Sequence, residues 1–157
     1  MRSGEETPGA RAPLVRAKLA GAAGRRRAAP LVPGEGPLRG LTAAERALLA
    51  AQGETPVYRA FLSTTRVDVG SWLRDGRVWV CARRVDLLLF AAGPRPFVER
   101  LAFNALQSSA YNHVTGELIL APAEGARVRQ VRALPAEALA VLEWMRHSAP
   151  RAAARSA

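Results

Sequence analysis

Residues 74–90, with the sequence RDGRVWVCARRVDLLLF, contain two turns and two apolar runs in direct succession. Arg74-Asp75-Gly76-Arg77 has the composition of a tight turn, and Val78 to Cys81 is a β-branched and aromatic run typical of a strand. Arg83 to Asp86 predicts a second turn, and Leu87 to Phe90 form a continuous apolar run, as in a buried strand. The stretch therefore predicts two neighbouring strands of a β-rich domain.

Five further segments on either side have strand-like sequences, separated by glycine, proline or polar turns. They are residues 57–65, 97–102, 108–114, 117–120 and 127–132. Together with the two apolar runs they make about seven short strands with no long helix between them. This spacing predicts an antiparallel meander that folds into a sandwich or a barrel.

A single amphipathic helix is predicted to follow the strands, beginning at Pro135. Proline suits the first turn of a helix, and Arg146 and His147 suit the last turn, where positive charge interacts favourably with the helix dipole. Apolar residues recur at helical spacing on one face, which we expect to be buried: Ala138, Val141, Leu142 and Met145. The expected fold class is therefore mainly β, with about seven antiparallel strands capped by a C-terminal α-helix.

The segment before the strands differs in composition from the rest of the chain. Its first 40 residues are rich in proline, glycine, alanine and arginine, which opposes helix and sheet, so we expect a disordered basic arm. A short helix is expected next, because Thr42 and Glu45 have the spacing of a capping box. The chain is thus divided into a disordered arm (1–40), a short helix (41–53), a β-domain with its helix (54–148) and a disordered tail (149–157).

The 157-residue chain has a formal net charge of +10, and the excess lies mostly in the two ends: the first 40 residues have eight basic and three acidic side chains, and the tail adds Arg151 and Arg155. The arginines of this arm, including Arg25, Arg26 and Arg27, are suited to contact with nucleic acid or another anionic surface. Cys81 is the only cysteine, and no apolar stretch reaches the roughly 18 residues that span a bilayer. We therefore expect a cytoplasmic protein without a transmembrane segment.

About seven strands followed by one C-terminal helix resemble the pleckstrin-homology-like superfold, including its bacterial members. Trp144 adds to the resemblance, because the helix of that family commonly carries a tryptophan packed on the barrel. The resemblance covers roughly residues 56–147 and implies two nearly orthogonal sheets that form an open barrel, with the helix plugging one end. It also implies a binding module, whose ligands are phosphoinositides in some members and peptides or proteins in many others.

Lipid-binding members of that family have a basic, usually lysine-containing motif across the first two strands and their loop. The matching stretch here has no lysine, is interrupted by Asp68 and Asp75, and offers the arginines Arg59, Arg66, Arg74 and Arg77. Trp72 lies in the same loop, between glycines and beside arginines, where an exposed tryptophan is suited to a partner groove or a membrane interface. The candidate partner- or anion-binding residues are therefore Arg66, Trp72, Arg74 and Arg77, with Arg25, Arg26 and Arg27 in the arm.

The leading hypothesis is a non-enzymatic, bacterial binding or scaffolding module whose partner is a protein or, as an alternative, an anionic membrane surface. A second hypothesis is nucleic-acid binding by the arginine-rich arm. A third is a small-ligand carrier or an enzyme that uses the polar strand Tyr111-Asn112-His113. No catalytic, cofactor-binding or metal-ligating residue is expected, since Cys81 lies in an apolar strand and the two histidines are far apart in sequence.

Overall fold

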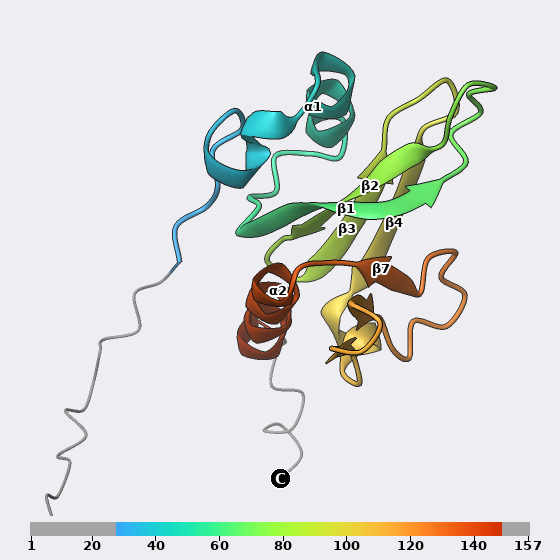
Figure 1. The fold of residues 1–157 in the computed structure, drawn as a ribbon. Helices are drawn as coiled ribbons and strands as arrows, with labels where there is room; N and C mark the ends of the chain where they lie inside the picture. Colours follow the sequence, from blue (N-terminus) through green and yellow to red (C-terminus); the bar gives the residue numbers. More distant parts are fainter. Residues whose placement is uncertain (1–27, 149–157) are drawn as a thin grey trace, which may run out of the picture.

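The computed structural model of the protein describes residues 28–148, and Figure 1 shows how their elements are arranged. Seven strands form two antiparallel sheets and a helix follows the last strand, which confirms the expected mainly β class and the strand number. The strands are β1 (Arg59–Val67), β2 (Gly76–Ala82), β3 (Asp86–Ala91), β4 (Phe97–Ala102), β5 (Ala110–Asn112), β6 (Glu117–Ile119) and β7 (Gln130–Arg132). The helices are the 3-10 helices η1 (Gly36–Gly40) and η2 (Phe103–Leu106) and the α-helices α1 (Ala43–Ala50) and α2 (Pro135–Ser148).

The larger sheet has four strands in the order β1-β2-β3-β4. Its centre is the β2–β3 hairpin formed by residues 74–90, in which Val80 pairs with Leu89. The hairpin turn is closed because the backbone N–H of Arg83 donates to the carbonyl oxygen of Asp86 at 2.9 Å. Nearly every residue of these two strands is buried, on both faces of the sheet, which explains why their sequences are apolar without alternation.

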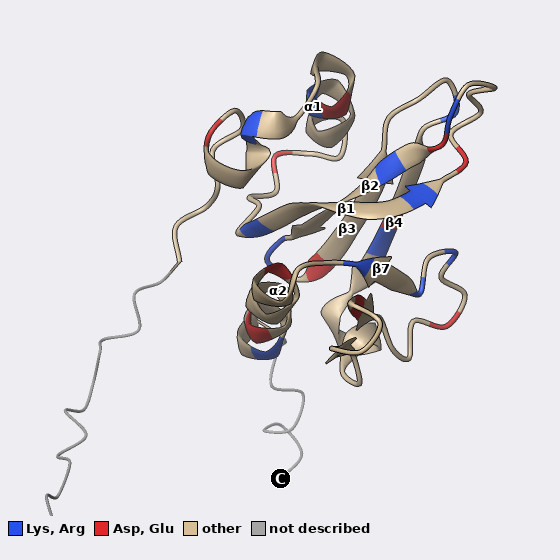
Figure 2. Cartoon of the chain, in the orientation of Figure 1, with Lys and Arg blue, Asp and Glu red and all other residues tan. Residues whose placement is uncertain are grey.

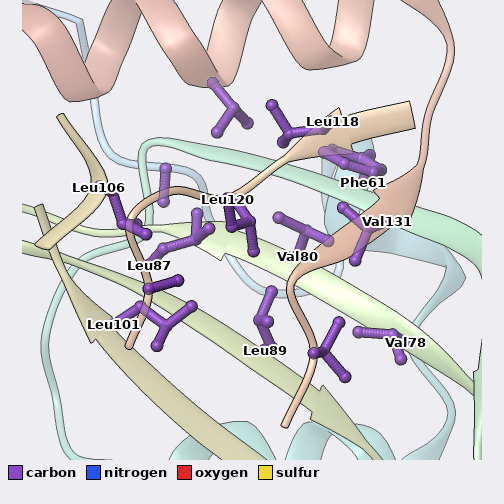
Figure 3. Close-up of a cluster of buried hydrophobic side chains, with 14 of the residues drawn as sticks. Phe61, Val78, Val80, Leu87, Leu89, Leu101, Leu106, Leu118, Leu120 and Val131 are labelled. Carbon is purple, nitrogen blue, oxygen red and sulfur yellow. The ribbon is translucent and has the colours of Figure 1, made fainter. Parts of the chain in front are cut away.

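The smaller sheet, in the order β5-β6-β7, and helix α2 pack on one face of the larger sheet. Figure 3 shows the main core between them, whose members include Phe61, Val80, Leu87, Leu89, Leu118, Leu120 and Val131. Helix α2 adds Ala138, Val141, Leu142 and Met145, so the buried face expected from helical spacing is confirmed.

Trp144 fixes helix α2 to the larger sheet. Its ring stacks on Tyr58 with 4.3 Å between ring centroids, and the guanidinium carbon of Arg59 lies 5.8 Å from the tryptophan ring. Its indole N–H donates to the carbonyl oxygen of Arg83 at 2.7 Å. The helix is thereby joined both to the start of β1 and to the β2–β3 turn.

The two sheets do not close into a barrel, and of the two arrangements expected from the sequence, a sandwich or a barrel, the observed one is two packed sheets. On one side, the hydroxyl of Ser63 donates to the carbonyl oxygen of Arg132 at 2.6 Å, and the N–H of Arg132 donates to Thr65 Oγ1 at 2.8 Å. Side chains of β1 therefore satisfy backbone groups of β7 where a barrel would have a continuous backbone ladder. We call this contact the β1–β7 seam.

A second seam joins strand β4 to the loop before β7. The carboxylate of Glu99 accepts hydrogen bonds from the backbone N–H groups of Arg127 at 2.8 Å and Val128 at 3.1 Å. In return, the guanidinium of Arg127 donates to the carbonyl oxygen of Val98 at 2.8 Å and lies 4.5 Å from the ring centroid of Phe97. We call this contact the β4 seam, and it shields an edge that would otherwise present unsatisfied backbone groups.

The opposite face of the larger sheet is covered by residues 31–57, which we call the N-terminal cover (Figure 1). The N–H of Leu31 donates to the carbonyl oxygen of Val57 at 2.6 Å, which ties the two ends of the cover together. Leu38, Leu41 and Val57 from the cover form a second buried cluster with Trp79, Cys81, Leu88 and Phe90 of the sheet. Both faces of the larger sheet are therefore shielded from water.

The cover changes the expected domain organisation. Residues 28–40, expected to belong to a disordered arm, have a defined structure and contribute the fully buried Leu38. Residues 1–27 and 149–157, which include the rest of the expected arm and the expected tail, lie outside the described residues. The expected short helix and its capping box are confirmed, since the N–H of Thr42 donates to the Glu45 carboxylate at 2.8 Å and the N–H of Glu45 donates to Thr42 Oγ1 at 3.2 Å.

Candidate functional site

The β1–β2 loop, residues 68–75, projects from one end of the larger sheet, at the upper right of Figure 1. We call this loop the tip. Trp72 in the tip is 92% exposed and Leu73 is 72% exposed. Two large apolar side chains that stand together in water give a surface whose burial against a partner is favourable. The tip is therefore a candidate contact surface.

The base of the tip is anchored to the neighbouring β3–β4 loop. Val69 is buried, and its carbonyl oxygen accepts the N–H of Arg95 at 2.7 Å. A Cβ at Gly93 would lie 2.5 Å from a side-chain carbon of Val69, so this close approach requires glycine. The carboxylate of Asp68 accepts the N–H of Gly70 at 2.7 Å, at a glycine with φ of 72°. Trp72 is thus carried on a fixed base.

Arg66, Arg74 and Arg77 line a shallow groove of about 560 Å³ beside the tip, between the ends of β1 and β2 and the start of α1. Arg66 donates to the carbonyl oxygen of Asp75 at 3.2 Å, and Arg77 donates to that of Ser63 at 3.2 Å. Each guanidinium has five N–H groups, so these bonds leave donors for a further acceptor. The structure therefore brings together the three arginines that were expected from sequence to bind a partner.

Charges of both signs surround the tip, as Figure 2 shows at the ends of β1 and β2. Arg95 from the β3–β4 loop lies against Gly70, and the acidic residues Asp68 and Asp75 lie within the tip itself. Sequence reasoning missed Arg95 and Leu73 as members of this surface. The rigid turn Gly93-Pro94-Arg95-Pro96 could have indicated Arg95, because an antiparallel meander places the β1–β2 and β3–β4 loops at the same end of the sheet.

The other arginines singled out from the sequence, Arg25, Arg26 and Arg27, lie outside the described residues.

Tyr111, Asn112 and His113 shape the β5–β6 hairpin. The hydroxyl of Tyr111 donates to the carbonyl oxygen of Ala133 at 3.1 Å. The side-chain oxygen of Asn112 accepts the backbone N–H groups of Val114 at 2.9 Å and Thr115 at 3.4 Å, and His113 is exposed with its ring against the edge of Tyr111. These contacts use the polar groups of Tyr111 and Asn112 within the hairpin turn and its join to α2.

Cys81 is fully buried in β2, within the second apolar cluster. Burial raises the pKa of its thiol from 9.0 to about 12, and the positive charge of Arg83 offsets only part of that rise. The thiol therefore stays protonated near neutral pH, which removes the thiolate that nucleophilic chemistry or metal binding would need.

Within residues 28–148, no three histidine, cysteine, aspartate or glutamate side chains come together in a way that could hold a metal ion. In the same part of the chain, no helix combines the length and the apolar character needed to cross a membrane. Comparisons of the chain with protein-family models, with curated proteins and with solved structures found no match.

Proposed function

We propose that this protein is a non-enzymatic binding module that docks onto a protein partner through the tip. The observation that carries the proposal is the exposure of Trp72 and Leu73 on an anchored loop beside Arg66, Arg74 and Arg77. Tryptophan and arginine are the residues that most often dominate the binding energy of protein interfaces. A fixed base also lowers the entropy that the loop would lose on binding.

A protein partner is favoured over an anionic membrane because of the charges around the tip. Arg66, Arg74, Arg77 and Arg95 are offset in part by Asp68 and Asp75. These six side chains leave a net charge of only +2, whereas recognition of acidic lipids typically relies on clusters of about four to eight basic residues. Mixed charge around an apolar centre instead suits a partner with charges of its own, which would set the orientation of docking.

We further propose that the fold belongs to the pleckstrin-homology-like superfold. Support comes from the four-plus-three division of the strands, the helix after the last strand and the packing of Trp144 against the larger sheet. This assignment fits a binding module, but fold alone does not select the ligand, so the docking proposal rests on the tip.

The proposal is tested with the full-length protein as bait in a lysate of its source cells, with quantitative mass spectrometry as the readout. The double variant Trp72→Ser/Leu73→Ser removes the apolar tip, and Val114→Ser/Leu134→Ser removes two similarly exposed apolar residues elsewhere. We expect one partner to be recovered by the wild type and the control and reduced about tenfold or more for the tip variant. That partner is then purified and its dissociation constant measured for all three proteins.

Equal recovery of every protein by the wild type and the tip variant would contradict the proposal. Vesicles of phosphatidylcholine with phosphatidylserine provide the parallel measurement. Tip-dependent binding to these vesicles, without a tip-dependent protein, would assign the same surface to a membrane instead.

A further inference from the structure

A cleft of about 530 Å³ lies between helix α1, the rest of the N-terminal cover and the β2–β3 turn, away from the tip. Its volume is within the range of small-molecule sites, which is about 300–1,000 Å³. Most of its wall is apolar and comes from the cover: Leu31, Leu38, Leu49 and Val57. The chain itself thus builds a small apolar chamber on the side of the sheet that the smaller sheet does not reach.

Two guanidinium groups also line this cleft, from Arg46 on α1 and Arg83 in the β2–β3 turn. Arg83 is only 3% exposed. Its Nε and Nη2 donate to Asp86, and its Nη1 makes one long bond of 3.4 Å to the carbonyl oxygen of Gln52. Because a guanidinium has five N–H groups, two donors of this buried side chain have no acceptor among the described residues.

Arg46 is exposed, and its Nη1 donates to the carbonyl oxygen of Leu41 at 3.1 Å. Four of its five donors therefore have no acceptor among the described residues. Arg46, Arg83 and Glu54 line the cleft, and Asp86 already pairs with Arg83, so the unused guanidinium donors, and not an excess of positive charge, are what an anionic end would bind. An apolar chamber with guanidinium donors is complementary to a molecule with an apolar body and an anionic end.

We propose that this cleft binds a small aliphatic carboxylate, with its chain against Leu38 and Leu49 and its carboxylate at Arg46 and Arg83. A carboxylate matches the planar fork of a guanidinium, and its single charge makes it easier to bring into an apolar cleft than a doubly charged phosphate. The site is independent of the tip, so the failure of one proposal leaves the other standing.

The test uses isothermal titration calorimetry of the full-length protein with octanoate, and with 1-octanol as the uncharged probe of equal chain length. We expect octanoate to bind saturably at one site per chain, at least about tenfold more tightly than 1-octanol. Arg46→Gln, a substitution at an exposed position, should weaken octanoate binding about tenfold and leave 1-octanol binding unchanged.

A pair of variants on α1 locates the site. Ala50→Trp places a large side chain in the cleft, whereas Ala47→Trp is exposed on the same helix and does not line the cleft. We expect Ala50→Trp to abolish the binding of both probes and Ala47→Trp to preserve it, with thermal unfolding showing that both variants are folded. The proposal is overturned if octanoate does not bind saturably, or if it binds folded Ala50→Trp as tightly as the wild type. It is also overturned if octanoate binds no more tightly than 1-octanol and Arg46→Gln leaves octanoate binding unchanged.

Discussion

The guanidinium of Arg83 and the carboxylate of Asp86 are joined by two hydrogen bonds, 2.6 Å from Nε and 2.5 Å from Nη2. The Arg83 side chain is almost wholly buried, and that of Asp86 is 17% exposed. The same turn receives the indole N–H of Trp144 from α2. A charge pair therefore lies where the central hairpin, the C-terminal helix and the N-terminal cover meet.

Replacing Asp86 by alanine should destabilise the protein by about 3–5 kcal/mol, because the buried guanidinium of Arg83 would lose its carboxylate and keep its charge. The measurement is urea unfolding followed by tryptophan fluorescence. Asp75→Ala in the exposed tip is the control and should change the free energy of unfolding by less than about 0.5 kcal/mol. A loss of under about 1 kcal/mol for Asp86→Ala would show that the pair does not hold the turn.

Cys81 should resist alkylation by iodoacetamide in the native protein at pH 8 and react when the protein is unfolded in urea. Its pKa rises from 9.0 to about 12 on folding, so the folded state holds the thiol proton more strongly than the unfolded state. The resulting stability is fully present below pH 9 and is lost as the pH rises towards 12.

Between pH 9 and pH 12, the contribution of this thiol to the free energy of unfolding should fall by about 1.4 kcal/mol per pH unit. Cys81→Ala lacks this contribution and should show a shallower decline, measured as urea midpoints from pH 8 to pH 11. Parallel curves for the two proteins, or rapid native alkylation at pH 8, would contradict the burial of Cys81.

A chain that begins at residue 54 should fail to fold cooperatively, whereas one that begins at residue 28 should fold like the full-length protein. The shorter chain lacks Leu38 and Leu41, so Trp79 and Phe90 would face water on one side of the sheet. Near-ultraviolet circular dichroism and gel filtration distinguish the outcomes. A cooperative thermal transition of equal midpoint in both chains would place the domain boundary at residue 54 after all.

Glu99→Ala should destabilise the protein by about 1.5–3 kcal/mol, because the carboxylate accepts two backbone N–H groups in the β4 seam. Glu124→Ala, which changes an exposed glutamate in the loop that leads to the same seam, should have little effect. Chemical denaturation reports both values. Hydrogen exchange should also speed up at the amides of Arg127 and Val128 in Glu99→Ala only, and unchanged exchange there would speak against the seam.

The strands were predictable where the local pattern and the tertiary environment agree. Residues 97–102 form β4 as expected, and the apolar runs at 78–81 and 87–90 lie inside β2 and β3. The strand expected at 127–132 is reduced to Gln130–Arg132, because the backbone of Arg127 and Val128 bonds to the Glu99 side chain instead of a strand. Side-chain bonds between distant segments leave no trace in local periodicity.

The N-terminal cover was not predicted, because composition reports only local backbone preferences. The prolines and glycines oppose regular helix and sheet, but they do not indicate what Leu38 packs against. The missing clue was in the strands themselves. An unbroken apolar run such as 78–81 requires that both faces of its sheet be shielded from water. The smaller sheet and helix α2 together cover only one face, so a further segment had to cover the other. The same omission hid the cleft, while Arg66, Arg74 and Arg77 beside the tip were anticipated because they lie on one hairpin.

The N-terminal cover leaves the ribosome before the strands it lies against. Leu38 is synthesised roughly fifty residues ahead of Phe90, which at about 5–20 residues per second is a delay of about 3–10 s. During that interval Leu38 and Leu41 have no sheet to pack on. Residues 31–41 of the cover, in which four apolar residues are spaced among prolines and glycines, are suited to remain an open nascent chain until the sheet has been made.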